Sequence, residues 1–201
     1  MKCVVLVGGS STGKDTVFKQ LLLHDICIEA VSHTTRPQRE NETEGKEYYF
    51  ISDDEFNKMV YEKEFIERRT YHTEFGTWQY GLSKKAINPN SNNIYVAILD
   101  LQGLKQLEEY IGKENVISIY LESLPSTRLI RSIEREKEKI NNEALTGTTK
   151  TLDEIRRRLV VDFNDFKKAE YYCDVTLPNE TKEDIDTIVS CICGLIYWIN
   201  W

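Results

Sequence analysis

The start of the chain changes from a strand-like to a helix-like pattern of apolar positions. Residues 3–7 are continuously apolar and rich in valine, as in a strand that is covered on both faces. After the glycines that follow, apolar residues recur with helical spacing at Val17, Leu21 and Leu22. The pattern predicts a buried strand, a glycine loop and a helix.

Further apolar runs continue this alternation. Residues 94–99 and 116–121 are again continuously apolar, and each run precedes helix-like sequence. A shorter run at Val175–Leu177 precedes the apolar segment IDTIVSCICGLIYWINW, which falls short of a membrane-spanning helix and begins among charged residues. The sequence therefore predicts an α/β core with a parallel sheet and a docked last helix, formed by residues 1–31, 90–124 and 169–201.

Two insertions interrupt the alternation. Residues 32–89 are rich in Thr, Tyr, Phe and Glu, and they predict a short helix at 53–62 between strand-like stretches. Residues 125–168 carry six arginines on two helical segments, joined by the polar stretch INNEALTGTTKT. We expect a small mixed lobe and a mobile basic flap within a single domain of 201 residues.

The overall charge limits the class of partner. The chain has 26 Lys plus Arg against 33 Asp plus Glu, which leaves a net charge of −7. This balance argues against a general affinity for nucleic acid or for acidic membranes, so an anionic ligand must meet a local basic cluster. The N-terminal apolar run is too short for a signal sequence, and we expect a cytoplasmic protein.

The cysteines indicate the same compartment. Their number is five, and most lie inside apolar runs, as reduced thiols of cytosolic proteins do. Cys191 and Cys193 have the spacing of half a metal site, but no second pair or nearby histidine completes one. We therefore expect buried, unpaired thiols.

The glycine loop has the pattern of a phosphate-binding loop. Gly8, four further residues, Gly13 and Lys14 match GxxxxGK between a predicted strand and a predicted helix. Glycines allow several backbone N–H groups to point at one phosphate, and the lysine reaches the β and γ oxygens. The expected ATP contacts in this loop are Gly8, Ser10, Ser11, Thr12, Gly13, Lys14, Asp15 and Thr16.

Asp15 stands where such loops usually provide a hydroxyl to Mg²⁺. Two interpretations are open. The carboxylate binds the hard cation directly or through water, or it repels the phosphates and Thr16 or waters serve instead. A loop that bound phosphate without metal would gain nothing from an extra negative charge, which favours the use of Mg²⁺ with Asp15 and Thr16 as candidate ligands.

A second basic cluster follows in SHTTRPQRENETEGKEYYFIS, residues 32–52. Arg36 and Arg39 lie three residues apart, and Pro37 between them favours an extended backbone, so both guanidinium groups are expected to converge on one anion. Tyr48 adds a hydroxyl donor. The alternative is a solvated patch of surface ion pairs.

Together these motifs resemble the guanylate kinase family. The resemblance comprises the phosphate loop, an STTR-like segment with a second arginine, GExxGxxYxF, FIE, a YG turn with a nearby serine, and DxQG, in order from Val4 to about Asn179. It implies a three-layer phosphate-loop core with an inserted nucleoside-monophosphate lobe and a helical lid. The implied reaction is phosphoryl transfer from ATP to GMP or dGMP, with Mg²⁺ and small-molecule nucleotides as the partners.

The resemblance also assigns residues. Monophosphate contacts fall on Arg36, Arg39, Tyr48 and Tyr80. Base contacts fall on Ser32, Glu67 and Ser83, and a carboxylate at Glu67 can accept from guanine N1–H and N2–H₂, which adenine does not offer. The contact to the adenine of ATP falls on Asn179.

Asp100 of the DxQG motif is expected in the GMP site and at the metal, where it would orient a Mg²⁺-bound water or brace the phosphate loop. Lid arginines that stabilise the transferred phosphoryl group fall on Arg131, Arg135 and Arg158, with a register uncertain by a residue or two. Lys14 completes the expected catalytic set.

Three departures from the family pattern bear on the acceptor. They are Asp15, the apolar Ile98 where many members have a carboxylate, and the long segment RTYHTEFGTWQYGLS. The reaction class is therefore better specified than the acceptor, which could be GMP, dGMP or another nucleoside monophosphate. A catalytically weak binding module for a phosphorylated partner is the competing hypothesis, and a monomer and a homodimer are both open.

Overall fold

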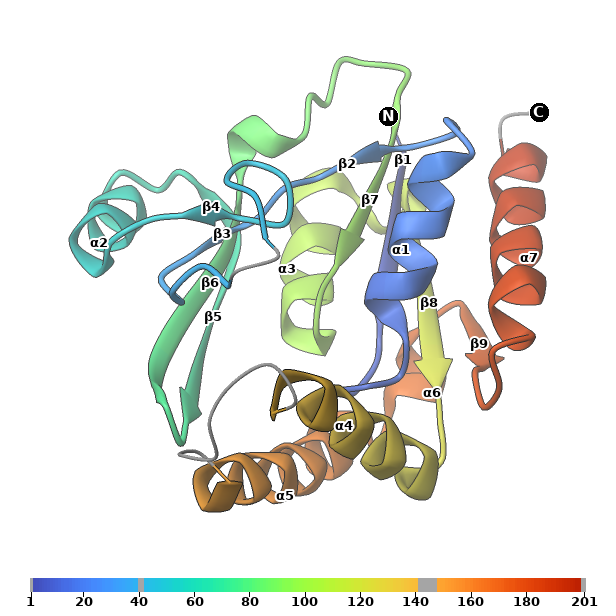
Figure 1. Ribbon diagram of the computed structural model, residues 1–201. Coiled ribbons are helices and arrows are strands. Elements are labelled where there is room, and N and C mark those ends of the chain that lie inside the picture. The colour runs from blue at the N-terminus through green and yellow to red at the C-terminus, as the bar shows by residue number, and fades with distance from the viewer. Residues whose placement is uncertain (1, 40–41, 141–147, 200–201) are drawn as a thin grey trace. The chain divides into compact units, whose positions relative to one another are not determined.

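The computed structural model describes residues 2–39, 42–140 and 148–199 (Figure 1). The chain divides into two compact units, and neither is one continuous stretch of sequence. The first comprises the residues up to Val5 together with Cys27–Ile117, and the second comprises Leu6–Ile26 together with the chain from Ser118 onward. The boundaries fall inside β1 (Lys2–Val7) and at the start of β8 (Val116–Glu122).

The first unit contains part of a parallel sheet. Here β2 (Ile28–Glu29), β7 (Ile94–Ile98) and β1 follow one another, and β2 pairs with β7 in parallel through Ile28–Tyr95 and Glu29–Val96. As its continuous apolar sequence predicts, β7 is buried along most of its length. It leads through Asp100 into α3 (Leu101–Ile111), which ends at Gly112 with φ 87. Two short 3₁₀ turns lie at Lys84–Ala86 and Lys113–Asn115.

A second sheet of four strands forms the inserted lobe, in the order β4-β3-β6-β5. Its longest elements are β5 (Phe65–Thr73) and β6 (Gly76–Ser83), an antiparallel hairpin with a register shift between Phe65 and Glu67. The long segment noted in the sequence is therefore an extended hairpin. The short strands are β3 (His33–Thr34) and β4 (Tyr49–Phe50).

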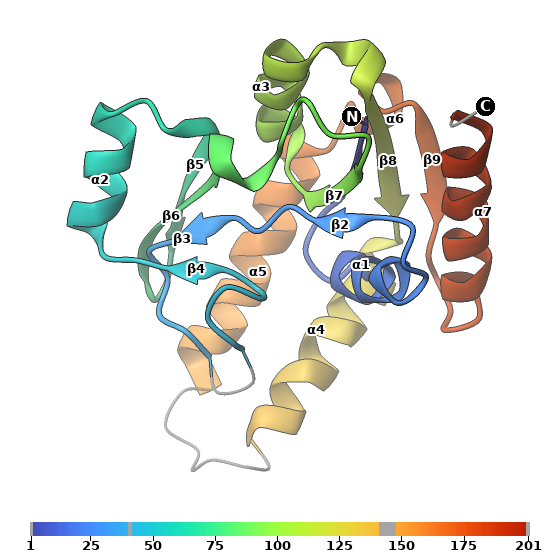
Figure 2. The same ribbon diagram turned by 90° about the horizontal axis from the view of Figure 1, so that it is seen from above.

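Helix α2 (Asp53–Tyr61) lies beside this sheet (Figure 2). It begins at a capping box, in which the Ser52 hydroxyl accepts from the Glu55 amide and the Glu55 carboxylate accepts from the Ser52 amide. Its buried Phe56 stacks on Phe65 of β5, with 4.5 Å between the ring centroids. The predicted helix at 53–62 is confirmed to within a residue.

In the second unit, β8 pairs in parallel with β9 (Val175–Pro178) from Ile119–Val175 to Glu122–Pro178. Helix α1 (Lys14–Leu23) follows the glycine loop, and α7 (Asp184–Ile199) packs beside it (Figure 1). The basic insertion forms α4 (Pro125–Ile140) and α5 (Thr148–Asp165), which lie side by side, and α6 (Ala169–Tyr172) follows. The middle of the predicted linker, residues 141–147, lies outside the described residues.

The predicted alternation of strands and helices with parallel pairing is confirmed. No helix within residues 2–39, 42–140 or 148–199 combines the length and the apolar character that a bilayer-spanning segment needs. Cys3, Cys27 and Cys173 are buried free thiols, as expected, whereas Cys191 is exposed. Burial raises the pKa of the Cys3 thiol to about 12.

Candidate active site

The arginine cluster of the first unit is centred on Arg36, which is only 5% exposed. Its guanidinium donates to both carboxylate oxygens of Glu42, at 3.0 and 2.8 Å, and to the Pro37 carbonyl at 2.8 Å. It also lies over the rings of Tyr48 and Phe50, with the guanidinium carbon 5.5 and 5.6 Å from their centroids. A fixed guanidinium among aromatic rings is a suitable anchor for a phosphate.

The predicted monophosphate contacts are partly brought together. Tyr48 and Tyr80 lie edge to face, with 5.6 Å between ring centroids, and Tyr80 interacts with the Arg36 guanidinium. Arg39 is exposed, and its backbone amide donates to Glu42 at 2.9 Å. The structure thus gathers three of the four residues directly and connects Arg39 to the cluster through Glu42.

Glu42 is a residue that the sequence analysis missed. Burial opposes its ionisation, but hydrogen bonds from Arg36 and from the Arg39 amide outweigh burial and lower the pKa of its carboxyl group. The glutamate of the GExxGxxYxF motif falls on this position, so the sequence contained a signal to which no role was given.

The predicted base contacts Ser32, Glu67 and Ser83 are all buried, and Glu67 is 1% exposed. Glu67 Oε1 accepts from the Leu82 amide at 2.9 Å. Burial raises the pKa of the Glu67 carboxyl group, while the Arg69 charge and the Leu82 amide oppose the rise. A buried carboxylate on a strand, turned away from water, is consistent with a recognition role.

Asp100 caps α3, so the structure gives it a different immediate role from the expected contacts. Its Oδ1 accepts from the Gly103 amide at 2.7 Å, and its Oδ2 accepts from the Tyr71 hydroxyl at 2.6 Å. Burial raises the pKa of the Tyr71 hydroxyl, so it remains a donor. Each carboxylate oxygen of Asp100 therefore accepts from one protein donor.

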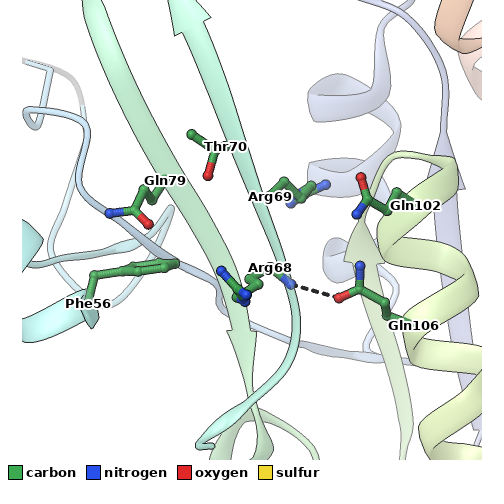
Figure 3. A pocket seen from close by; sticks show the side chains of 7 residues that line it. All are labelled: Phe56, Arg68, Arg69, Thr70, Gln79, Gln102 and Gln106. Atoms are coloured by element: carbon green, nitrogen blue, oxygen red, sulfur yellow. Dashed lines mark hydrogen bonds between the residues drawn. The ribbon is translucent and has the colours of Figure 1, made fainter. Parts of the chain in front are cut away.

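A polar pocket of about 430 Å³ is lined by residues of α2, β5, β6 and α3 (Figure 3). Arg69 extends from β5 toward Gln102 of α3, and the Arg68 amide donates to Gln106 Oε1 at 3.1 Å. Arg69 was not singled out in the sequence, although it follows Glu67 at the two-residue spacing of one strand face. The lining residues are Phe56, Arg68, Arg69, Thr70, Gln79, Gln102 and Gln106.

In the second unit, the glycine loop has the curled backbone that its sequence predicts. Gly13 caps α1 with φ 88, and a Cβ atom there would lie 2.3 Å from Asn179 Nδ2. The Lys14 ammonium donates to the Gly8 and Gly9 carbonyls at 2.7 Å each. The lysine thus folds back over the loop, where a bound phosphate would meet it.

Asn179 stabilises the glycine loop through a hydrogen bond to its backbone. It is fully buried, and its Nδ2 donates to the Thr12 carbonyl at 2.7 Å. Its backbone carbonyl accepts from Arg131 at 3.0 Å. The residue expected as an adenine contact therefore holds both the loop and a lid arginine.

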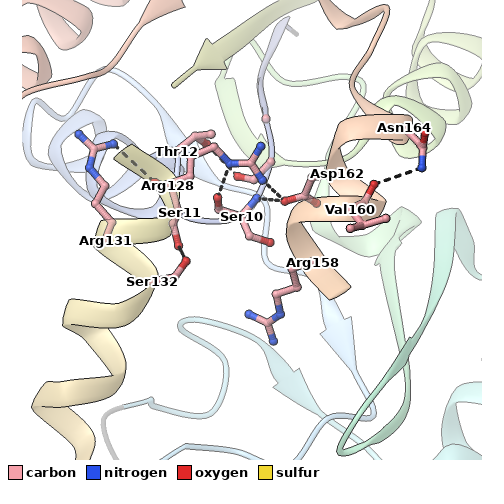
Figure 4. Close-up of polar contacts among 12 residues, drawn as sticks. Ser10, Ser11, Thr12, Arg128, Arg131, Ser132, Arg158, Val160, Asp162 and Asn164 are labelled. Carbon is pink, nitrogen blue, oxygen red and sulfur yellow. Dashed lines mark hydrogen bonds and ion pairs between the residues drawn. The ribbon is translucent and has the colours of Figure 1, made fainter. Parts of the chain in front are cut away.

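The lid contacts the loop through Arg131 and two residues that were not predicted, Arg128 and Asp162 (Figure 4). The Ser10 amide donates to Asp162 Oδ2 at 2.6 Å, and Arg128 Nε donates to the Ser10 carbonyl at 2.9 Å while the guanidinium pairs with Asp162. A Cβ atom at Gly9 would lie 2.5 Å from Arg128. The second glycine thus leaves room for the arginine.

The other two predicted lid arginines pair with acidic side chains of their own helices. Arg158 donates to Glu154 Oε1 at 2.6 Å and points away from Ser10 in Figure 4. Arg135 lies 3.7 Å from the Glu136 carboxylate. Arg135 shares the face of α4 that carries Arg128 and Arg131, but it lies one to two turns further along the helix, about 6–10 Å from them along the axis.

The candidate magnesium ligands Asp15 and Thr16 are exposed in the first turn of α1. Within the described ranges, no cluster of three or more His, Cys, Asp or Glu side chains could hold a metal by itself. One carboxylate and one hydroxyl still fit Mg²⁺, which keeps several waters and relies on substrate phosphates for further ligands.

Comparison with known proteins shows the family of the chain. The family model described as guanylate kinase matches residues 1–177. The chain belongs to the guanylate kinase family. The match includes every predicted site residue of this guanylate kinase family member except Asn179.

Individual relatives agree. Similar proteins named guanylate kinase include one from Clostridioides difficile, 30% identical over 96% of this chain and 85% of that protein. Another, from Wigglesworthia glossinidia brevipalpis, is 37% identical over 60% of this chain, and the match spans only 56% of that protein's length. A crystal structure of guanylate kinase from Anaplasma phagocytophilum superimposes with a TM-score of 0.67 at 27% identity, covering 98% of this chain and 84% of that one.

Proposed function

We propose that the chain transfers the γ-phosphoryl group of ATP to GMP or dGMP. The observation that carries the proposal is the Arg36 cluster. An almost fully buried guanidinium, fixed by Glu42 and bordered by Tyr48 and Tyr80, provides an anion site separate from the glycine loop. Two anion sites are what a phosphoryl transfer between two nucleotides requires.

The proposed roles follow from the donors at each site. Lys14 and the loop amides bind the ATP phosphates, and Arg128 and Arg131 bring positive charge to the loop. The acceptor phosphate oxygen is already a nucleophile at neutral pH, so positioning and charge stabilisation suffice without a covalent intermediate. When Mg²⁺ is bound with ATP, it neutralises phosphate charge, and Asp15 and Thr16 would hold it.

The proposal divides the chain into a core of residues 1–31, 90–124 and 169–201, an acceptor lobe of 32–89 and a lid of 125–168. Within it, Glu67 accepts from the base, with Ser32 and Ser83 nearby. Arg135 and Arg158 remain candidates for contacts to the transferred phosphoryl group when nucleotides are bound.

A coupled assay of ADP release tests the function. Purified protein is given ATP and Mg²⁺ with GMP, dGMP, AMP, UMP or CMP, and turnover with GMP or dGMP is expected. Absence of turnover with all five would overturn the enzyme proposal in favour of a binding module. Turnover with AMP or UMP but not with GMP would overturn the guanine assignment alone.

A further inference from the structure

Arg69 and Glu67 present two buried polar atoms that face one another without a hydrogen bond. Both side chains project from the same face of β5, and they are 9% and 0% exposed. Arg69 Nε lies 3.4 Å from Glu67 Oε2. Within the described ranges, each of these two atoms lacks a hydrogen-bond partner.

A buried donor and a buried acceptor that both lack a hydrogen-bond partner reduce the stability of a folded protein. Buried polar atoms are almost always hydrogen-bonded, and leaving one unmatched destabilises the fold. The charges of Arg69 and Glu67 attract, but the geometry does not complete the bond. The pair is therefore explained best by a ligand that donates to Oε2 and accepts from Nε–H.

We propose that Arg69 is a base-recognition residue, which together with Glu67 reads the N1–H and C6=O edge of a 6-oxopurine. The inference rests on the proposed function and specifies its acceptor. N1–H donates to Glu67 Oε2, and O6 accepts from Arg69 Nε–H. Adenine has an acceptor at N1 and an amino donor at C6, so both contacts would be mismatched.

The same geometry provides little for the 2-amino group that distinguishes guanine from hypoxanthine. Glu67 Oε1 accepts from the Leu82 amide, and the two oxygens of Asp100 accept from Gly103 and Tyr71, so a 2-amino group would share an oxygen with a protein donor and gain no acceptor of its own there. Ile98 offers no polar group in its side chain. The acceptors therefore comprise the class of 6-oxopurine monophosphates, so IMP is phosphorylated as well as GMP.

The space around Glu67 Oε2 depends on Gly103. A Cβ atom at this position would lie 3.0 Å from Glu67 Oε2 and 3.3 Å from Asp100 Oδ1. Gly103→Ala therefore crowds the free acceptor without removing either charge. It provides a second perturbation of the same contact that leaves Arg69 in place.

The test compares GMP, IMP and AMP in steady-state kinetics and in direct calorimetric binding without ATP. The variants are Arg69→Met, Arg69→Lys and Gly103→Ala. Arg156→Met is the matched control, because Arg156 is an arginine of α5 whose side chain is 81% exposed. Thermal unfolding of each variant identifies any that fails to fold.

The expected results separate recognition from a structural role. In the native protein, KM for IMP lies within about tenfold of KM for GMP, because a single additional contact has limited discriminating power. Arg69→Met raises KM and the dissociation constant for both by about tenfold to a hundredfold, as loss of a charged hydrogen bond does, with kcat little changed. Arg69→Lys and Gly103→Ala give the same pattern to a smaller extent, and Arg156→Met gives no change.

Two results would overturn the inference. The first is native protein that discriminates against IMP by more than about a thousandfold, the magnitude expected of a site built around the 2-amino group. The second is folded Arg69→Met or Gly103→Ala protein with native affinity for GMP. Absence of turnover would overturn the proposed function instead, and the calorimetric comparison would still decide the role of Arg69.

Discussion

Replacement of Glu42 by Gln tests the arginine cluster most directly. The change keeps the shape of the side chain but removes the charge that faces Arg36 and places an amide group against one guanidinium N–H. Arg36 is 5% exposed and Glu42 is 13% exposed, so water replaces little of the lost interaction. Breaking a buried ion pair from one side costs about 3–5 kcal/mol, and a retained amide acceptor reduces this to about 2–3 kcal/mol.

For a chain of 201 residues, this loss corresponds to a melting temperature lower by about 5–10 °C at neutral pH. The difference in melting temperature between the native and the Glu42→Gln protein also depends on pH. The pKa of Glu42 is lowered in the folded state, so its contribution is complete above its ordinary pKa, which is about 4.3, and is lost as the pH falls through the lowered value. Differential scanning calorimetry from pH 7 down to pH 3 should therefore show the melting temperatures of the native and Glu42→Gln proteins converging as the pH falls.

Activity provides the second measurement. Because Glu42 orients Arg36, Glu42→Gln should raise KM for GMP about tenfold while KM for ATP changes little. Glu62→Gln is the control, since Glu62 is an exposed glutamate at the end of α2. If Glu42→Gln protein melted with the native protein at pH 7 and bound GMP normally, the pair would not position Arg36 and the reasoning would be refuted.

Two further predictions concern the glycine loop. Gly13→Ala should abolish measurable ATP binding by calorimetry, because its Cβ would lie 2.3 Å from Asn179 Nδ2 and its φ of 88 suits glycine alone; native ATP affinity would contradict the loop geometry. Asp15→Ala should lower kcat about tenfold at limiting Mg²⁺, whereas Asp15→Ser should retain most of the activity, because the exposed side chain assists metal binding. Normal Mg²⁺ dependence of the alanine variant in the ADP-release assay would show that the carboxylate has no role at the metal.

Local patterns were sufficient to predict the main elements. The apolar run before Gly8 and the helical spacing after Gly13 predict β1, the loop and α1, since each depends on residues adjacent in sequence. The capping role of Asp100 was also available from the sequence, because an aspartate directly before an amphipathic helix is a common N-cap.

The partners of the arginines were not predictable in the same way. Arg36 pairs with Glu42 and Arg128 pairs with Asp162 across turns or between helices, and charge alone does not distinguish these acids from their neighbours. Arg128 and Arg135 lie on the same side of α4, so the choice between them depends on which turn of the helix meets the loop. Tertiary packing decides that position, and the periodicity of the sequence does not contain it.

The division of the chain within β1 and β8 constrains the order in which the protein forms during synthesis. The phosphate loop is synthesised about a hundred residues before Ser118, and its unit is completed only by the chain from Ser118 onward. At cellular elongation rates, the loop segment waits roughly 8–30 s for Asn179 and α7. The acceptor lobe, whose hairpin is local in sequence, has its partners much earlier. A nascent chain stalled before Ser118 would therefore expose the apolar residues of β1 and α1 that later elements cover, and these are the segments a chaperone would meet first.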